Sequence, residues 1–320
     1  MTKRHAKTVH VDFPAITKTN SLKTSFNTAV IFDVSSKLNA ISPIDEFILN
    51  NNKINLIWLG PNDPSPELAS LVLLGYVSAV ESYMRALFRG IIHIDLSCRR
   101  HLSTSAISFE AAMNHARVNM PDALLENTTF VGEESVKKAV SKFLNLVKGF
   151  QGMEKHFEEF EKICQLRHCC THRFGKLGAK NASVLGMSTH SKFLEKHMKL
   201  NSEALNEAAE ILRSFVKSFN NDIFGRIIER TVEEQLNESI PAAEKVKWTW
   251  NFKTDKSTFN QYYKLFASKH DSIRSKSCKI TNDGFVATLQ PPSKNAAVQN
   301  ATTSKGLQNN MGIPAIAVQT

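Results

Sequence analysis

Apolar residues recur at steps of three and four through the centre of the chain, which is the spacing of one buried helix face. The segment 67–92 has this pattern, and 133–150, 154–174 and a segment that starts near Asn201 or Ser202, both suitable N-caps, repeat it. In 67–92 the apolar positions are Leu73, Val77, Val80, Met84, Leu87, Phe88 and Ile91. Four or five long amphipathic helices with no strand signal between them predict a bundle of roughly 170 residues.

The flanks of this region carry a different pattern. TAVIFDV at 28–34 and KINLIWLG at 53–60 are rich in β-branched and aromatic residues, which predicts two short strands. KWTWNF at 247–252 alternates aromatic and polar residues like a strand, and STFNQYYKLF at 257–266 returns to helical spacing. We therefore expect a mainly α protein: a helical bundle of four to five helices, with a short mixed N-terminal extension and a small C-terminal α/β appendage.

Proline and composition divide the chain into four parts. The prolines of GPNDPSPEL mark a boundary just before the first long helix. We expect an N-terminal extension at 1–62, the bundle at 63–235, an aromatic and basic appendage at 236–290 and a tail at 291–320. The tail consists mainly of Asn, Gln, Ser, Thr and Ala, with little to bury, so we expect it to be disordered.

The formal net charge of +10 is concentrated in the two ends of the chain. Residues 1–24 and 241–320 hold the excess of Lys and Arg, and the part between them is close to neutral. Such ends either bind phosphate by counterion release or keep flexible arms solvated.

Cysteine usage and hydropathy place the protein in the cytoplasm. The five cysteines are odd in number, and Cys169 and Cys170 are adjacent, so reduced thiols are expected instead of a disulfide framework. No run approaches the ~18 consecutive apolar residues of a membrane-spanning helix. The basic start of the chain has no apolar run behind it that would act as a secretory signal. We expect a cytoplasmic protein with no membrane partner.

One short run, QLRHCCTHRFGKLG at 165–178, gathers cationic, titratable and thiol side chains at the end of a predicted helix. On a helix, Cys164, His168 and His172 form one stripe. Arg167 and His172 are five residues apart, which separates them by ~140° around the helix axis.

This run resembles the signature of the HEPN superfamily, helical-bundle proteins with an Arg, four to six residues and then a His, commonly with a polar residue directly after the Arg. Here Arg167, His168 and His172 occupy those positions. Members of the superfamily also tend to carry an acidic residue on an earlier helix, and Glu81 stands in that place. The resemblance covers about 65–235 and implies a HEPN-like helical bundle.

The activity that the resemblance implies is metal-independent cleavage of RNA, in which the ribose 2′-hydroxyl attacks the adjacent phosphorus, in a toxin or antiphage-defence role. His172 would carry the proton transfer, because an unperturbed histidine pKa of ~6.5 allows both protonation states near neutrality. Arg167 would present its planar fork to phosphate oxygens. Glu81 would orient either side chain, and His168 would contact phosphate or donate a second proton.

The resemblance also implies partners. HEPN ribonucleases usually form the site across a two-fold dimer, so we expect a homodimer, RNA as substrate and an antitoxin or sensor protein as restraint. Arg173, Lys176 and Arg85 are the further residues expected to bind RNA. No metal or cofactor is implied.

Each candidate has an alternative interpretation. Glu81 and Arg85 are spaced for an exposed i, i+4 ion pair, and Arg167 is a cation that favours a helix C-terminus. Cys164, His168 and His172 have the donor types of a zinc site. The three donors rise along one helix, however, so the first and last are too far apart for a single ion, and only His168 with His172 plus ligands from elsewhere could bind zinc. The aromatic and lysine cluster at 247–266 either stacks on RNA bases or forms a small core.

The alternative function is a non-catalytic HEPN-like dimeric module that binds RNA or a protein partner.

Overall fold

The computed structural model describes residues 16–17, 24–35, 41–116 and 119–291, and its contacts divide the chain into residues 1–40 and 41–320. In the first unit, Thr28–Ile31 forms a 3-10 turn whose N-cap, Asn27, accepts a hydrogen bond from the Ala29 amide. The strand predicted at 28–34 is therefore wrong. The side chains of Phe32 and Val34 are exposed, and this capped turn satisfies its backbone locally instead of in a ladder.

The strand predicted at 53–60 is also wrong, because this run forms the last turns of helix α1 (Pro43–Trp58). Ser42 caps the helix, with its Oγ accepting from the Asp45 amide, and Pro43 occupies the first turn. One apolar face of α1 packs against α2 and α9. Tertiary burial of this face outweighs the β-propensity of the final residues. The buried apolar residues of α1 are Pro43, Ile44, Phe47, Ile48 and Trp58.

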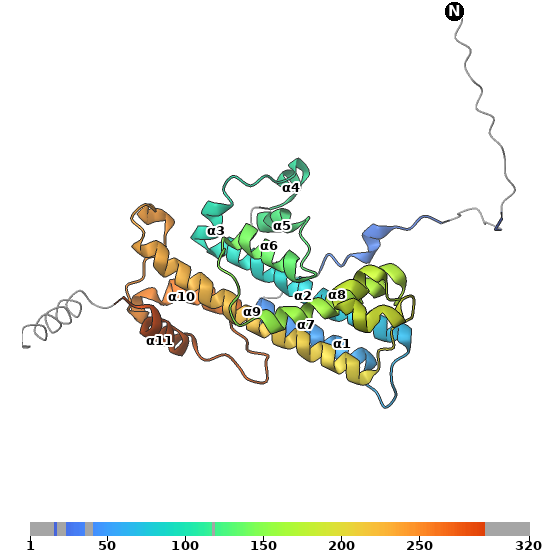
Figure 1. Ribbon diagram of the computed structural model, residues 1–320. Coiled ribbons are helices and arrows are strands. Elements are labelled where there is room, and N and C mark those ends of the chain that lie inside the picture. The colour runs from blue at the N-terminus through green and yellow to red at the C-terminus, as the bar shows by residue number, and fades with distance from the viewer. Residues whose placement is uncertain (1–15, 18–23, 36–40, 117–118, 292–320) are drawn as a thin grey trace, which may run out of the picture. The chain divides into compact units, whose positions relative to one another are not determined.

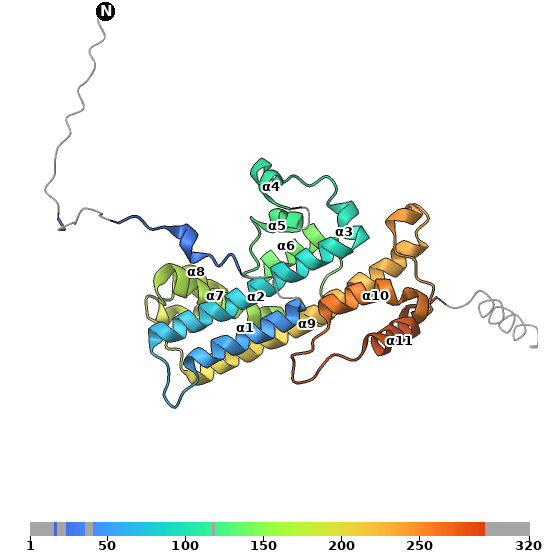
Figure 2. The ribbon, with the colours of Figure 1, turned by 180° about the vertical axis from the view of Figure 1, so that it is seen from behind.

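Three long helices, α2 (Pro66–Ile94), α7 (Glu154–Arg173) and α9 (Ser202–Leu236), contact one another pairwise and form the centre of the bundle. Figures 1 and 2 show α1 lying along α2 and α9. Stacked aromatic rings fill the interior, with the Phe160 and Phe215 centroids 4.2 Å apart. Long predicted helices at 67–92, 154–174 and from Asn201 are confirmed, and Asn201 is the N-cap of α9.

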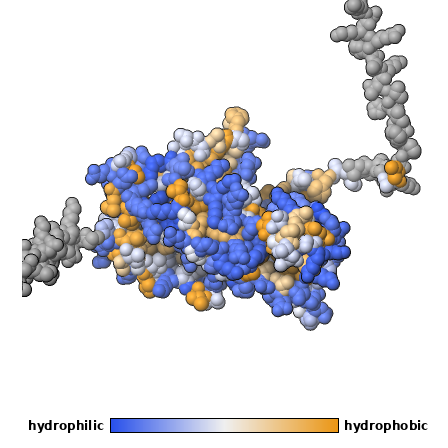
Figure 3. Space-filling view, in the orientation of Figure 1, coloured by the Kyte–Doolittle hydropathy of each residue, from blue (hydrophilic) through white to orange (hydrophobic). Residues whose placement is uncertain are grey.

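Shorter helices surround this centre. Helix α6 stops six residues before the predicted end at 150, because Asn145 adopts a left-handed conformation with φ of 53°. Figure 3 shows apolar surface in the region of α8. Val184 and Met187 of this helix are exposed. The shorter helices of this part of the chain are α3 (Leu96–His101), α4 (Phe109–Asn114), α5 (Met120–Leu125), α6 (Glu133–Leu144), α8 (Ala179–His190) and a 3-10 turn at Ser191–Phe193.

The C-terminal appendage is helical, with α10 (Phe252–Phe266) and α11 (Cys278–Leu289) after a 3-10 turn at Ala242–Glu244. The strand predicted at 247–252 is wrong, and so is the α/β class of the appendage. Trp248 is buried here and donates its indole N–H to Thr231 of α9, while Asn251 caps α10. The rings of Trp248, Phe259 and Phe285 contact one another, so the aromatic cluster forms a core.

Two buried carboxylates join the appendage to the bundle. Asp95, at the N-cap of α3, accepts from Arg230 of α9 at 2.6 Å and from the Tyr262 hydroxyl of α10 at 3.1 Å. Asp45 of α1 accepts from the Ser268 hydroxyl and from the Lys269 amide after α10. The described part of the chain is mainly α and contains no strand, only an isolated bridge between Lys176 and His197. The tail predicted to be disordered lies almost wholly outside the described residues.

Among the described residues, α2 alone is long and apolar enough to cross a membrane by length and composition. In the bundle, 56% of its most apolar window is buried. The helix therefore fits a core helix as well as a membrane span.

Candidate active site at the end of α7

The end of α7 is fixed by two consecutive residues with positive φ. Phe174 has φ of 50° and Gly175 has φ of 87°, and the amides of both donate to the Cys169 carbonyl. The chain then pairs with the segment before α9, because the Leu177 amide donates to Lys196 and the Met198 amide donates to Gly175. The last turns of α7 are thus held against the bundle.

Arg167 is half-buried on the penultimate turn of α7. Among the described residues, no group pairs with its guanidinium; only its carbonyl is engaged, by the Thr171 hydroxyl at 3.0 Å. A partly desolvated cation without an acidic partner keeps its full charge and all of its donors for an added anion.

His168 and His172 lie on one stripe of the helix, as the spacing predicts. Their ring centroids are 5.9 Å apart, with the ring planes at 78°. Burial lowers the pKa of His168, and the charges of Arg167 and His172 lower it further. His168 is therefore neutral at pH 7, while His172 is exposed to solvent.

Glu81 and Arg85 on α2 hold a neighbouring loop. The Glu81 Oε1 accepts from the Phe130 amide at 3.3 Å. Arg85 donates to the Leu125 carbonyl at 2.8 Å and also to the Thr128 carbonyl. Among the described residues, neither side chain hydrogen-bonds to Arg167 or His172, and no ion pair joins Glu81 to Arg85.

The surface around the motif is strongly basic. Arg173 pairs with Glu195, and Lys176 is exposed beside them. From 165 to 199 the sequence carries seven Lys or Arg and one Glu. Averaging charge over the whole centre of the chain hides this excess, which a shorter window would have found.

The thiols of the motif point into the protein. Cys164 and Cys169 are buried, and burial raises the pKa of both, so the thiol form dominates. Within the described ranges, no group of three His, Cys, Asp or Glu side chains has an arrangement that would hold a metal ion.

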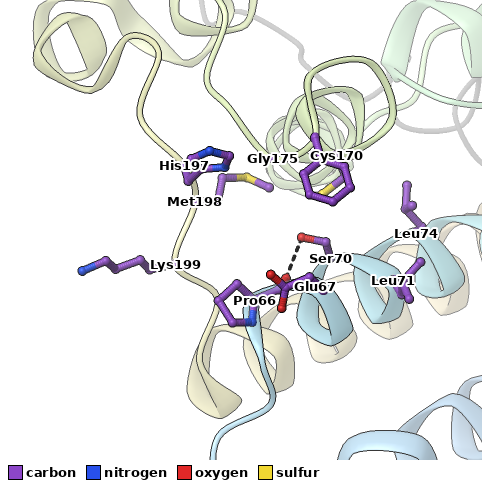
Figure 4. A pocket seen from close by; sticks show the side chains of 11 residues that line it. Pro66, Glu67, Ser70, Leu71, Leu74, Cys170, Gly175, His197, Met198 and Lys199 are labelled. Atoms are coloured by element: carbon purple, nitrogen blue, oxygen red, sulfur yellow. Dashed lines mark hydrogen bonds between the residues drawn. The ribbon is translucent and has the colours of Figure 1, made fainter. Parts of the chain in front are cut away.

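An apolar pocket of about 560 Å³ opens beside the motif, between α2, the end of α7 and the segment before α9. Figure 4 shows Leu71 and Leu74 along α2 on one side and His197 and Met198 on the other, with Lys199 pointing outward. The sequence offers no signal for this pocket, because its walls come from segments about 125 residues apart. Its full lining is Pro66, Glu67, Ser70, Leu71, Leu74, Cys170, Phe174, Gly175, His197, Met198 and Lys199.

Comparison with known proteins leaves the residues themselves as the basis for a function. No protein-family model, curated protein or solved structure matches the chain.

Proposed function

We propose that the chain is a metal-independent endoribonuclease of the HEPN type, with its active site at the end of α7. The observation that carries this proposal is a half-buried arginine with no acidic partner among the described residues, next to two histidines whose rings are 5.9 Å apart. The two histidines differ in environment, which suits the two proton transfers of the reaction.

The proposed reaction divides the work among three side chains. Neutral His168 accepts the proton of a ribose 2′-hydroxyl, whose oxygen forms a bond to the adjacent phosphorus. Arg167 stabilises the extra charge on the non-bridging phosphate oxygens. His172 donates a proton to the 5′-oxygen as its bond to phosphorus breaks. The products are a 2′,3′-cyclic phosphate and a 5′-hydroxyl.

A homodimer is part of the proposal, because one α7 offers a single set of these groups. A two-fold interface places the same patch of each copy together, so two sets would line one cleft. The exposed Val184 and Met187 of α8, the helix next to the end of α7, supply apolar surface for such an interface. A cytoplasmic toxin or antiphage effector with this activity needs restraint, and an antitoxin or sensor protein would provide it.

Cleavage of mixed RNA by the purified protein in EDTA tests the proposal. We expect cleavage with 2′,3′-cyclic phosphate ends, and a loss of ~10² to 10⁴-fold in the variant His172→Ala. The matched control is His101→Ala, which removes an exposed histidine on α3 whose one hydrogen bond within the described residues is to the Lys142 carbonyl. Intact RNA with wild-type protein at high concentration would contradict the proposal.

The second candidate function is a non-catalytic dimeric module that binds RNA or a protein partner. The observation that favours it is the position of Glu81, whose carboxylate holds the Phe130 amide and orients neither Arg167 nor His172. In that case His172→Ala would leave RNA affinity nearly unchanged, and no cyclic phosphate would form.

A further inference from the structure

Phe174 combines an unfavourable backbone conformation with an exposed side chain. Its φ of 50° lies in the left-handed region, which is costly for residues other than glycine, and Gly175 directly after it occupies the same region. The Phe174 side chain is nevertheless 79% exposed, so burial of the ring does not offset this cost. The conformation ends α7 with two amide bonds to the Cys169 carbonyl, and it holds the Phe174 ring at the surface.

The ring belongs to the apolar pocket beside the motif. Leu71 and Leu74 form one wall, and Met198 and His197 form the other. The volume of about 560 Å³ falls within the range of small-molecule sites. A mainly apolar pocket lined by the rings of Phe174 and His197 suits an aromatic heterocycle.

The pocket shares a face of α7 with Arg167. At about 100° per residue, Cys170 of the pocket lies about 60° from Arg167 around the helix axis, and Phe174 caps α7 one turn after Cys170. The rise along the axis from Arg167 to Phe174 is about 10 Å. A single nucleotide therefore spans the two positions, with its phosphate on Arg167 and its base in the pocket.

The charge around the pocket favours a polyanion over an apolar protein segment. Lys199 and His197 line the pocket, Lys176 comes two residues after Phe174, and Arg173, which pairs with Glu195, comes directly before it. Glu67 is the one carboxylate in the lining. Basic side chains that follow the backbone, together with aromatic rings that stack bases, are the combination that binds single-stranded nucleic acid.

We propose that this pocket takes an unpaired base of the RNA, stacked on Phe174, while the adjacent phosphate lies on Arg167. The inference rests on the proposed function and adds to it a binding site on this chain for an unpaired base beside the phosphate on Arg167. Because every base has a flat face and the apolar walls offer few hydrogen-bonding groups, the pocket selects for unpaired bases with little preference among them. A base held in a duplex cannot enter.

The test measures binding separately from cleavage. A single-stranded RNA oligonucleotide with 2′-O-methyl groups has no free 2′-hydroxyl, so it binds without being cut. A 2-aminopurine base in this oligonucleotide loses fluorescence when it stacks. We expect the variant Phe174→Gly to bind roughly 10- to 100-fold more weakly than wild type and to leave the fluorescence unquenched. Its thermal stability should equal or exceed that of wild type, because glycine adopts this φ freely.

Two controls accompany this variant. Phe193→Ala removes another exposed phenylalanine, on the 3-10 turn after α8 and outside the pocket, and it should bind like wild type. An oligonucleotide without bases should bind weakly to wild type and to Phe174→Gly alike.

The outcomes separate this inference from the proposed function. Equal affinity of wild type and Phe174→Gly would overturn the inference, and so would a dimer that dissociates in Phe174→Gly while affinity per site is kept, since the pocket would then contact a second copy. Weaker binding by Phe174→Gly with no cleavage of native RNA would support the pocket and overturn the nuclease. Cleavage of duplex and single-stranded RNA at equal rates would overturn the pocket and leave the nuclease standing.

Discussion

His168 and His172 lie one turn apart on α7, with their ring planes nearly perpendicular and their centroids 5.9 Å apart. Burial and the charges of Arg167 and His172 lower the pKa of His168. A base of this kind stays ready to accept a proton below neutral pH. Cleavage should therefore persist as the pH falls below ~6.5 and decline only as His168 becomes protonated, and the acid limb of kcat/KM against pH measures this. In His168→Gln that limb should disappear together with most of the activity.

The same residue should link stability to pH. The unfolded chain binds a proton at His168 near pH ~6.5, whereas the folded protein binds it only at lower pH. The unfolded state therefore gains protons first, and stability falls as the pH drops through this window. The difference in Tm between about pH 7.5 and about pH 5 should be smaller in His168→Gln than in wild type. An unchanged difference would show that His168 keeps its ordinary pKa in the folded protein.

Removing Arg167 should separate the catalytic effect that we propose for it from any structural effect. Its guanidinium has no partner among the described residues, so Arg167→Ala should fold with an unchanged Tm. The loss of a nearby positive charge should raise the pKa of His168, as NMR titration of the imidazole would measure. Cleavage should fall ~10² to 10³-fold, with partial activity in Arg167→Lys, which keeps the charge but lacks the fork. A large drop in Tm would mean that Arg167 mainly supports the fold.

Asp95→Ala should be among the most destabilising single changes in the protein. The substitution leaves the buried Arg230 without its partner at 2.6 Å, and it removes the acceptor of Tyr262 and the cap of α3. We expect a loss of roughly 3 to 5 kcal/mol in the free energy of unfolding, measured by urea denaturation. The matched control is Asp122→Ala, which breaks a half-exposed ion pair with Arg89 and should cost no more than about 1 kcal/mol.

Asp45 should make the attachment of the appendage sensitive to acid. Burial acts to raise the pKa of Asp45, but hydrogen bonds from Ser268, His270 and Lys269 outweigh it and hold the pKa below its usual value. Its contribution to stability is present above the unfolded pKa of ~3.9 and is lost as the pH falls through the lower folded pKa. Asp45→Asn should increase amide exchange at 268–270 at neutral pH. Exchange equal to that of wild type would show that these bonds add little.

The long helices could be predicted because their periodic pattern is strong and their caps are local. The prediction for 67–92 differs from α2 by one residue at its start and two at its end, and Asn201 caps α9 as expected. Local pattern was misleading at 53–60, where β-branched residues end a helix whose other turns are buried against α2 and α9. Trp248 and Trp250 alternate like strand residues, but the Trp248 indole is buried against α9, and the described part of the chain offers no strand to pair with.

For the candidate site, the sequence predicts how the side chains of α7 are arranged along the helix. It does not predict which groups from other elements surround them. The spacing of His168 and His172 places them on one stripe, and this is confirmed. The partners of Glu81 and Arg85 could not be predicted, because they are backbone groups at the end of α5 and in the loop after it, 40 to 49 residues away. The pocket is likewise a product of the tertiary fold, since Leu71 and Met198 meet only when α2 and the segment before α9 come together.

The hydrogen bonds that join 175–177 to 195–198 also bear on how this protein can change. They join the two ends of the segment 178–194, which contains α8, and Leu177 is bonded to both Glu195 and Lys196. Changes of length between these two points therefore leave the start of α9 in place, while Asn181 of α8 separately ties this segment to Gln165 of α7. A new recognition element is best inserted in this segment away from Asn181, which bonds to α7, and away from Val184 and Met187, which the proposed dimer interface uses.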